Sequence, residues 1–371
     1  MIENNCLGLI FANMHDNALG ELTENRTTGS VPFGGRYRFI DFSLSNMVNS
    51  GISTVGIITK HNYASLMDHL GSGRNWDLAR KRGGLVMLPP YGRPGTGIYN
   101  GRLEALSNAK GFLEKRREDY VILSDTNLIA NIDLSDILDY HKAKKADVTL
   151  VYKEMNTDGI GGNYNTVITE RDRVTDILKS SGETGKHKVS LEILVMSRED
   201  ILKLCKETVS HSLSSMTKDY LRKNIDTLKI CGYNFKGYAD IINSQKNYYE
   251  ANMRLLDSKA REKLFQADKP VHTKVRDDFP ASYGLESSTS NSIIADGCII
   301  DGTVENSILF RGVTVAKGAS VKNSILMQGT YVGENSSVSY VVTDKNVSVS
   351  EGASLSGTEN YPVYFAKGRT V

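Results

Sequence analysis

The tetrapeptide Asn291-Ser-Ile-Ile294 recurs as Asn306-Ser-Ile-Leu309 and as Asn323-Ser-Ile-Leu326, at spacings of 15 and 17 residues. A degenerate copy, Ser339-Tyr-Val-Val342, follows them. Around these copies aliphatic residues lie six positions apart, and Gly, Asp, Asn and Ser fill most positions between them. Such a period predicts a parallel β-helix, in which every coil has three short strands and stacks aliphatic side chains inside. An antiparallel sandwich would show a period of two. The aliphatic positions are Ile294, Ile300, Val315, Val321, Met327, Val332, Val338, Val349 and Leu355.

The residues before the repeats alternate between short apolar runs and stretches with a helical pattern. This alternation is typical of a largely parallel sheet with helices on both faces, and ligands of such sheets bind beyond the carboxyl ends of the strands. We therefore predict an α/β domain at residues 1–252, a charged linker with two prolines at 253–288, and the β-helix at 289–371. The predicted strands are 7–12, 55–59, 120–124, 148–152 and 193–196, and the predicted helices are 42–49, 101–115 and 134–145.

Composition narrows the possible partners and the compartment. The 371 residues include 45 Lys and Arg against 43 Asp and Glu, a net charge of +2, which argues against nucleic acid as a partner. No apolar run approaches the ~20 residues that a membrane helix needs. The first residues lack the pattern of a signal peptide, so we expect a cytoplasmic protein. Its four scattered cysteines fit a reducing compartment and offer no zinc site.

The most specific stretch is Val31-Pro-Phe-Gly-Gly-Arg-Tyr-Arg-Phe-Ile-Asp-Phe-Ser-Leu-Ser-Asn-Met-Val-Asn-Ser-Gly-Ile52. With later blocks such as His69-Leu-Gly-Ser-Gly73, Leu88-Pro-Pro90 and Tyr248-Tyr-Glu-Ala-Asn252, it resembles the glucose-1-phosphate adenylyltransferase (ADP-glucose pyrophosphorylase) family. The resemblance implies a Rossmann-like nucleotidyltransferase domain with a mixed, mostly parallel sheet. It also implies that the β-helix is left-handed and that the assembly is a tetramer.

Catalytic members of that family join ATP to glucose 1-phosphate and hold the triphosphate with a glycine loop, Ala-Gly-Gly-x-Gly-Thr-Arg-Leu-Gly. Glycine lets backbone N–H groups approach the phosphates closely. Here the loop reads Ala12-Asn-Met-His-Asp-Asn-Ala-Leu-Gly20, in which Asn13, Met14 and Asp16 replace glycines and Ala18 replaces the arginine. Thr28 stands where the family has a second cation, a lysine. The loop is therefore expected to be a poor phosphate cradle.

The family's two magnesium ligands are aspartates, because a hard cation prefers charged oxygens. Ile241 takes the place of one, and either Thr126 or Asn127 takes the place of the other, depending on the alignment. Asp240 and Asp125 are adjacent and could build a displaced metal site. Neighbouring side chains of a strand point to opposite faces, which makes Asp240 a poor substitute.

Some binding groups remain. Lys179 and Ser190 match positions that meet the sugar phosphate in the family, but Glu192 replaces a glycine there. Arg36 and Arg38 lie where family members contact anionic effectors, and they could equally form structural ion pairs. The last histidine, His272, precedes the repeats, so the β-helix lacks the base that a hexapeptide acyltransferase needs.

Together these replacements make the chain resemble the GlgD-type, non-catalytic subunit of this family. We expect no catalytic residue, metal or cofactor in this chain, with Mg²⁺ used by a catalytic homologue that joins it in a heterotetramer for glycogen synthesis. A sugar phosphate or an anionic effector is a possible ligand, and neither nucleic acid nor membrane is expected. Two alternatives stay open, namely an active enzyme with a displaced metal site and a ligand-sensing or scaffold protein.

Overall fold

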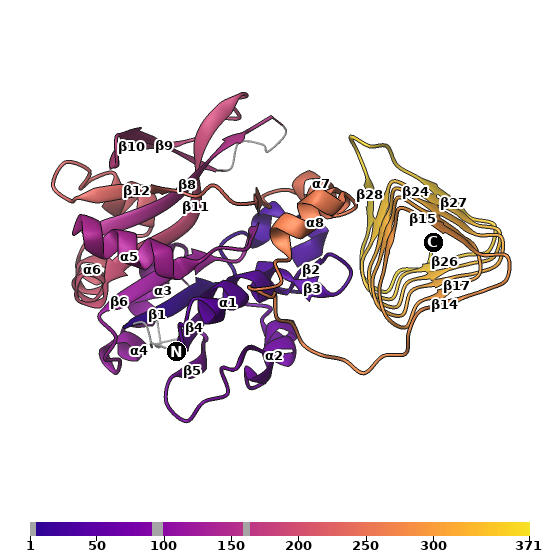
Figure 1. The fold of residues 1–371 in the computed structure, drawn as a ribbon, viewed down its shortest axis with the longest axis horizontal. Helices are drawn as coiled ribbons and strands as arrows, with labels where there is room; N and C mark the ends of the chain where they lie inside the picture. The colour runs from indigo at the N-terminus through magenta and orange to yellow at the C-terminus, as the bar shows by residue number, and fades with distance from the viewer. Residues whose placement is uncertain (1–4, 91–98, 159–163) are drawn as a thin grey trace.

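The N-terminal domain of the computed structural model, which describes residues 5–90, 99–158 and 164–371, is built on a nine-stranded mixed sheet (Figure 1). Seven strands run in the same direction, and β11 and β10 run the opposite way. The predicted mostly parallel sheet is thus confirmed, although the strand expected at 193–196 is antiparallel to its neighbours. The order is β5 (Gly84–Leu88), β4 (Thr54–Ile58), β1 (Cys6–Phe11), β6 (Tyr120–Asp125), β11 (Lys186–Ser197), β8 (Val148–Asn156), β12 (Ile230–Asn234), β10 (Arg173–Lys179) and β9 (Asn165–Glu170).

Both faces of this sheet are covered, which is why β1 reads as an unbroken apolar run. Leu7, Leu9 and Phe11 pack with α3, α4 and α6, whereas Ile10 packs on the other face with α1, α2 and α5. Ala109 divides the helix predicted at 101–115, close to Gly111, a weak helix former. The helices are α1 (Phe39–Asn49), α2 (Ala64–Leu70), α3 (Arg102–Asn108), α4 (Lys110–Glu114), α5 (Leu134–Lys144), α6 (Arg198–His211), α7 (Gln245–Arg254) and α8 (Ser258–Leu264).

Two short ribbons and several single turns complete the domain. The ribbon of β2 (Pro32–Phe33) and β3 (Tyr37–Arg38) turns through Gly34 and Gly35, whose φ angles of +60° and +84° suit glycine. The ribbon of β7 (Leu128–Ala130) and β13 (Ala239–Ile241) lies next to the end of β6. The turns are η1 (Asp16–Ala18), η2 (Gly20–Thr23), η3 (Thr28–Ser30), η4 (Arg74–Trp76) and the π-helical η5 (Met216–Leu221).

The repeats form a parallel β-helix with a triangular cross-section (Figure 1), as their period predicts. One face is β14 (Ser282–Tyr283), β17 (Ile299–Ile300), β20 (Thr314–Val315), β23 (Tyr331–Val332) and β26 (Ser348–Val349). The second is β15 (Ser288–Ser290), β18 (Thr303–Glu305), β21 (Ser320–Lys322), β24 (Ser337–Ser339) and β27 (Ser354–Ser356). The third is β16 (Ile293–Ile294), β19 (Ile308–Leu309), β22 (Ile325–Leu326), β25 (Val341–Thr343) and β28 (Val363–Phe365).

The repeat frame differs from the prediction in its last copy. Val342 pairs with Ile325, so Tyr340 corresponds to Asn323, one residue later than the predicted copy that opens at Ser339. Asn291, Asn306 and Asn323 have φ between +40° and +46°, and Tyr340 has φ +53° at the same corner. Asn accepts this left-handed conformation readily. A tyrosine in its place hides the copy in the sequence.

The two aliphatic residues of each repeat face opposite ways. Leu309 and Leu326 point into the β-helix core, whereas Ile308 and Ile325 belong to a core that includes Tyr248 and Tyr249 of α7. The repeat therefore encodes a domain interface as well as a β-helix interior. We call this shared core the domain seam; its other members include Val31, Phe33, Phe39, Phe42, Leu255, Leu264, Phe310, Met327 and Val342.

The linker predicted at residues 253–288 is more structured than expected. Helix α8 lies within it, and Leu264 of this helix is buried in the domain seam. The first strand of the β-helix, β14, pairs with β17 from Ser282 onward, ahead of the predicted boundary at residue 289. Because this segment is charged and contains prolines, the sequence did not indicate the buried side chain of Leu264 or the first coil of the β-helix.

The domain seam predicts that Ile325→Ala destabilises the protein by about 2–4 kcal/mol, because the fully buried side chain leaves a cavity. Ile299→Ala is the matched control, since Ile299 lies on another face of the same β-helix and is 46% exposed. Its effect should stay within about 0.5 kcal/mol. Urea unfolding measures both, and equal losses would contradict the assignment of Ile325 to the seam.

Candidate functional site

A cleft of about 570 Å³ lies beyond the carboxyl ends of β1 and β6. Its walls come from the loop after β1, the start of α3, strands β9, β10, β11 and β13, and the η5 segment. The position is the one expected for a ligand site on such a sheet. The predicted site residues that line it are Met14, Asn127, Lys179, Ser190 and Ile241. Asn13, Asp16, Ala18 and Thr28 lie outside its lining.

The two predicted metal positions are neighbours in the cleft. The backbone N–H of Ile242 donates to the carbonyl oxygen of Asn127 over 2.8 Å, which places Ile241 beside Asn127. Asp240 lies outside the lining and accepts from Arg254 Nη2 over 2.9 Å and from the hydroxyl of Tyr238. It is thus committed elsewhere, as its place in the strand predicts.

Four ionisable side chains from separate segments meet at the wall of the cleft, where three of them line it and Asp125 is buried. The guanidinium of Arg102 forms ion pairs with both Asp125 and Glu192, and His15 Nε2 lies 2.6 Å from Asp125 Oδ2. Burial alone would raise the pKa of Asp125, whose side chain is 1% exposed. Arg102, and then His15, outweigh that effect and hold the pKa below its ordinary value.

These residues do not fit a magnesium ion. The two positions that should supply carboxylates carry an amide and an isoleucine, and the nearby carboxylates Asp125 and Asp240 are paired with arginines. Across residues 5–90, 99–158 and 164–371, no group of three His, Cys, Asp or Glu side chains is arranged to hold a metal ion. A hard cation needs several oxygen ligands at once.

The degenerate glycine loop is closed by its own side chains. Asp16 Oδ1 accepts from the backbone N–H and the hydroxyl of Thr28, both over 2.7 Å, and Asp16 Oδ2 accepts from Asn13 Nδ2 over 2.5 Å. Asn13 Oδ1 in turn accepts from the backbone N–H of Lys60 over 2.8 Å. Burial raises the pKa of Asp16 despite these donors. The amide of Asn13 and both donors of Thr28 are therefore used within the loop.

The sugar side of the cleft keeps part of its predicted chemistry. Lys179 is exposed, and Ser190 is buried with its hydroxyl accepting from the backbone N–H of Glu192 over 3.2 Å. Glu192 has φ +56°, a conformation that favours glycine. Its Oε1 accepts from Asn165 Nδ2 over 2.8 Å, so this carboxylate is held across the cleft.

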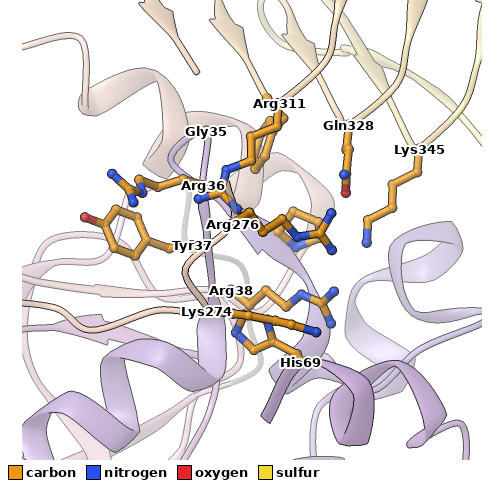
Figure 2. A pocket seen from close by; sticks show the side chains of 12 residues that line it. Gly35, Arg36, Tyr37, Arg38, His69, Lys274, Arg276, Arg311, Gln328 and Lys345 are labelled. Atoms are coloured by element: carbon orange, nitrogen blue, oxygen red, sulfur yellow. The ribbon is translucent and has the colours of Figure 1, made fainter. Parts of the chain in front are cut away.

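A second pocket lies between the N-terminal domain and the β-helix, and we call it the basic pocket (Figure 2). Its described lining contains no carboxylate. Such a concentration of positive charge suits an anion, because arginine and lysine bind phosphate and carboxylate oxygens through charged hydrogen bonds. The cationic residues that line it are Arg36, Arg38, Lys274, Arg276, Arg311 and Lys345.

The two predicted effector residues are placed differently in the basic pocket. Arg38 points into it with Arg276, Gln328 and Lys345, whereas Arg36 turns aside toward the ring of Tyr37 (Figure 2). The Arg36 guanidinium lies 5.9 Å from that ring's centroid. Arg38 is anchored by donating to Ser65 O over 2.7 Å. Burial lowers the pKa of Arg38 to about 10, which leaves it charged at neutral pH.

Lys345 is the group in the basic pocket whose charge is most sensitive to pH. Burial, followed by repulsion from Arg38 and Arg26, lowers its pKa to about 7. Its neighbour Asp344 instead accepts two hydrogen bonds of 2.7 Å from Arg26, in a buried ion pair that joins the two domains. The carboxylate closest in sequence to Lys345 is thus taken up by Arg26.

The comparisons with known proteins agree with this architecture. Residues 17–189 match the nucleotidyl transferase family model, and residues 279–360 match that of the GlmU-like C-terminal hexapeptide, in line with the left-handed β-helix. The glycogen biosynthesis protein GlgD of Bacillus subtilis is 34% identical over 86% of this chain and 83% of its own length. GlgD of Geobacillus stearothermophilus is 38% identical, and the glucose-1-phosphate adenylyltransferase of that species is 32% identical, each with the same two coverages.

The chain belongs to the glucose-1-phosphate adenylyltransferase family. This membership confirms the resemblance drawn from its motifs and supports a role in glycogen synthesis. Within the part of the chain that the structure describes, none of the helices combines the length and the apolar character needed to cross a bilayer.

Sequence reasoning missed several residues of both pockets. Arg102 and His15 gave no motif, because their role depends on Asp125 and Glu192, which are distant in sequence. The cations that the β-helix and the segment before it add to the basic pocket were also missed, because no local pattern shows which charges of distant segments meet. They are Lys274, Arg276, Arg311 and Lys345.

The lowered pKa of Lys345 predicts a pH-dependent contribution to stability. Between about pH 7 and pH 10 the unfolded chain keeps a proton on this lysine that the folded chain has lost, so folding becomes more favourable as pH rises. The unfolding free energy of the wild type minus that of Lys345→Met should therefore increase from pH 6 to pH 9, because the buried charge destabilises the wild type most at the lower pH. Urea unfolding across this range measures it, and a constant difference would contradict the lowered pKa.

Proposed function

We propose that this chain is a cytoplasmic, non-catalytic subunit of a glucose-1-phosphate adenylyltransferase that regulates or stabilises a catalytic homologue. The observation that carries the proposal is the pairing of the two carboxylates that lie next to the predicted metal positions. Asp125 is bound by Arg102 and His15, and Asp240 is bound by Arg254, at the place where catalysis requires carboxylates free to hold a metal. In this proposal Mg²⁺ is used by the partner alone.

The closed loop at Asp16 supports the same role. Phosphoryl transfer needs donors aimed at charge that develops in the transition state. Here Thr28 and Asn13 donate to Asp16 instead, so these donors are not available to a polyphosphate. Loss of the cradle, two cations and the metal ligands together leaves little catalysis of this kind.

The basic pocket supports regulation by an anion. Arg38, Arg276 and Lys345 converge in it without a carboxylate in its described lining, so an anionic effector would relieve their mutual repulsion. Since the pocket is formed by both domains, binding there would favour one arrangement of the domains over others. Subunit contacts would pass that preference to the catalytic partner as a shift in its conformational equilibrium.

The cleft itself offers a weaker ligand site. Lys179 and the hydroxyl of Ser190 face it from β10 and β11, and a sugar phosphate could meet them without a metal. Glu192 stands opposite as a negative charge, although Arg102 and Asn165 hold it in place. We include residual sugar-phosphate binding in the proposal as a secondary feature.

Kinetics with the catalytic homologue test the proposed role. The isolated chain, given ATP, glucose 1-phosphate and Mg²⁺, should turn over at least about 10³-fold more slowly than that homologue, because loss of one stabilising donor already costs about 10²–10³ in rate. Adding this chain should change the homologue's response to anions. The variant Arg38→Ala/Lys345→Met is expected to co-elute with the homologue yet lose that effect.

Two outcomes would overturn this role. Turnover by the isolated chain near the homologue's rate would favour the active enzyme with a displaced metal site. Separate elution in size-exclusion chromatography after co-expression, with kinetics unchanged, would favour a ligand-sensing or scaffold protein without such a partner.

Inorganic phosphate tests the basic pocket directly. At pH 8 Lys345 is mostly neutral, and a bound anion should raise its pKa and draw a proton from the buffer. Calorimetry in buffers of different ionisation enthalpy should show this uptake for the wild type. Lys345→Met should bind about tenfold more weakly and without uptake. Lys317→Met, a control at an exposed lysine of the β-helix, should behave as the wild type. Equal binding by all three proteins would exclude the pocket.

A further inference from the structure

The central feature of the cleft is an arginine placed between two carboxylates. Arg102 forms ion pairs with Asp125, which is the last residue of β6, and with Glu192, which lies in β11. We propose that Arg102 occupies the place that a divalent metal ion would take beside these two carboxylates. Its guanidinium holds them together without a metal, and it excludes divalent cations from the cleft.

The burial of these groups makes the arginine necessary. The side chain of Asp125 is 1% exposed, and those of Arg102 and Glu192 are 15% and 16% exposed. A carboxylate so deeply buried is strongly unfavourable unless it is paired and hydrogen-bonded. Arg102 gives one nitrogen to each carboxylate, and its positive charge thereby reduces the repulsion between the two segments that carry them.

The position of Arg102 is fixed by more than its ion pairs. It is the first residue of α3, next to Gly101, where a Cβ would collide with the carbonyl oxygen of Ser214. The guanidinium carbon also lies 6.0 Å from the ring centroid of Phe11, at the end of β1. Because the start of a helix disfavours positive charge, the arginine there is stabilised by the cleft and not by its helix.

Glu192 is held in the geometry that the arginine needs. Its backbone has φ +56°, an unfavourable conformation for a residue with a side chain. Its two carboxylate oxygens have separate donors, Asn165 Nδ2 at 2.8 Å and Arg102. The strain is thus balanced by charged hydrogen bonds, which a glycine at this position could not make.

The same arrangement explains why a metal would be excluded. A divalent cation bound to Asp125 or Glu192 would sit within a few ångströms of the guanidinium, where the repulsion between like charges is large. Removing the guanidinium would expose two carboxylates and His15 to each other. Carboxylate oxygens of this kind are suitable ligands for Mn²⁺.

Mn²⁺ binding by the full-length chain tests the proposal. Arg102→Met keeps most of the apolar stem of the side chain and removes the charge. Electron paramagnetic resonance titration should show one Mn²⁺ bound at least about tenfold more tightly by Arg102→Met than by the wild type. Mn²⁺ should raise the Tm of the variant and leave that of the wild type unchanged.

Two further variants test whether the gained Mn²⁺ binding comes from the freed carboxylates of the cleft or from any broken ion pair. Arg102→Met/Asp125→Asn removes a ligand and should lose the gained binding. Lys144→Ala breaks an ion pair of 2.6 Å with Asp172 at the surface, frees a carboxylate there, and should gain none.

Each remaining outcome decides the question. Saturable Mn²⁺ binding by the wild type in this cleft would overturn the proposal, as would an Arg102→Met protein that stays unfolded at every Mn²⁺ concentration. A variant that folds only with Mn²⁺ would support it. The inference deepens the proposed non-catalytic role and yet fails separately, since the titration involves neither a partner nor an activity.

Discussion

The basic pocket depends on the apolar contact between two domains. Six cationic side chains line it, and like charges at such distances repel unless something else keeps them together. The domain seam supplies that contact, because Ile308 and Ile325 of the β-helix are fully buried in one core with Tyr248 of α7. The buried ion pair between Arg26 and Asp344 adds a polar connection beside it. The packing of the two domains therefore holds these cations together in one pocket.

The two pockets solve the problem of buried charge in opposite ways. In the cleft, Arg102 satisfies Asp125 and Glu192, and the loop donors satisfy Asp16, so the chain meets its own electrostatic needs. In the basic pocket, no carboxylate belongs to the described lining, although Lys274 pairs with Asp68, and Arg311 pairs with Asp278 and Asp296 outside it. Buried charges that are already paired and hydrogen-bonded have little to gain from a charged ligand, whereas cations without a partner gain more. In the proposed function, ligand-dependent control therefore lies at the junction of the domains.

Much of the architecture could be predicted from the sequence, because periodicity survives substitution. The six-residue spacing identified the β-helix interior, except that Met327 is buried in the domain seam, and the buried runs identified the central strands. The predicted repeat frame was wrong at Tyr340, because a tyrosine replaces the usual asparagine at that corner. The predicted linker was wrong at Leu264, because no sequence pattern indicates that this side chain is buried. In the cleft, the replacements at Met14 and Ile241 were visible because a family motif defines those positions. Arg102 was not visible, since an ion pair between distant segments has no local signal.

The ion pair of Arg26 and Asp344 has a consequence for how the protein responds to ionic strength. Both side chains are about 5% exposed, so mobile ions screen their attraction only slightly. The half-open cations around Lys345 are reached by counter-ions far more readily. A concentrated salt solution would thus displace a weakly bound anion from the pocket, while the ion pair between the domains remains formed. Two adjacent residues of the β-helix thus differ in their response to salt: Lys345 lies in the pocket that salt affects, and Asp344 belongs to the ion pair that salt affects little.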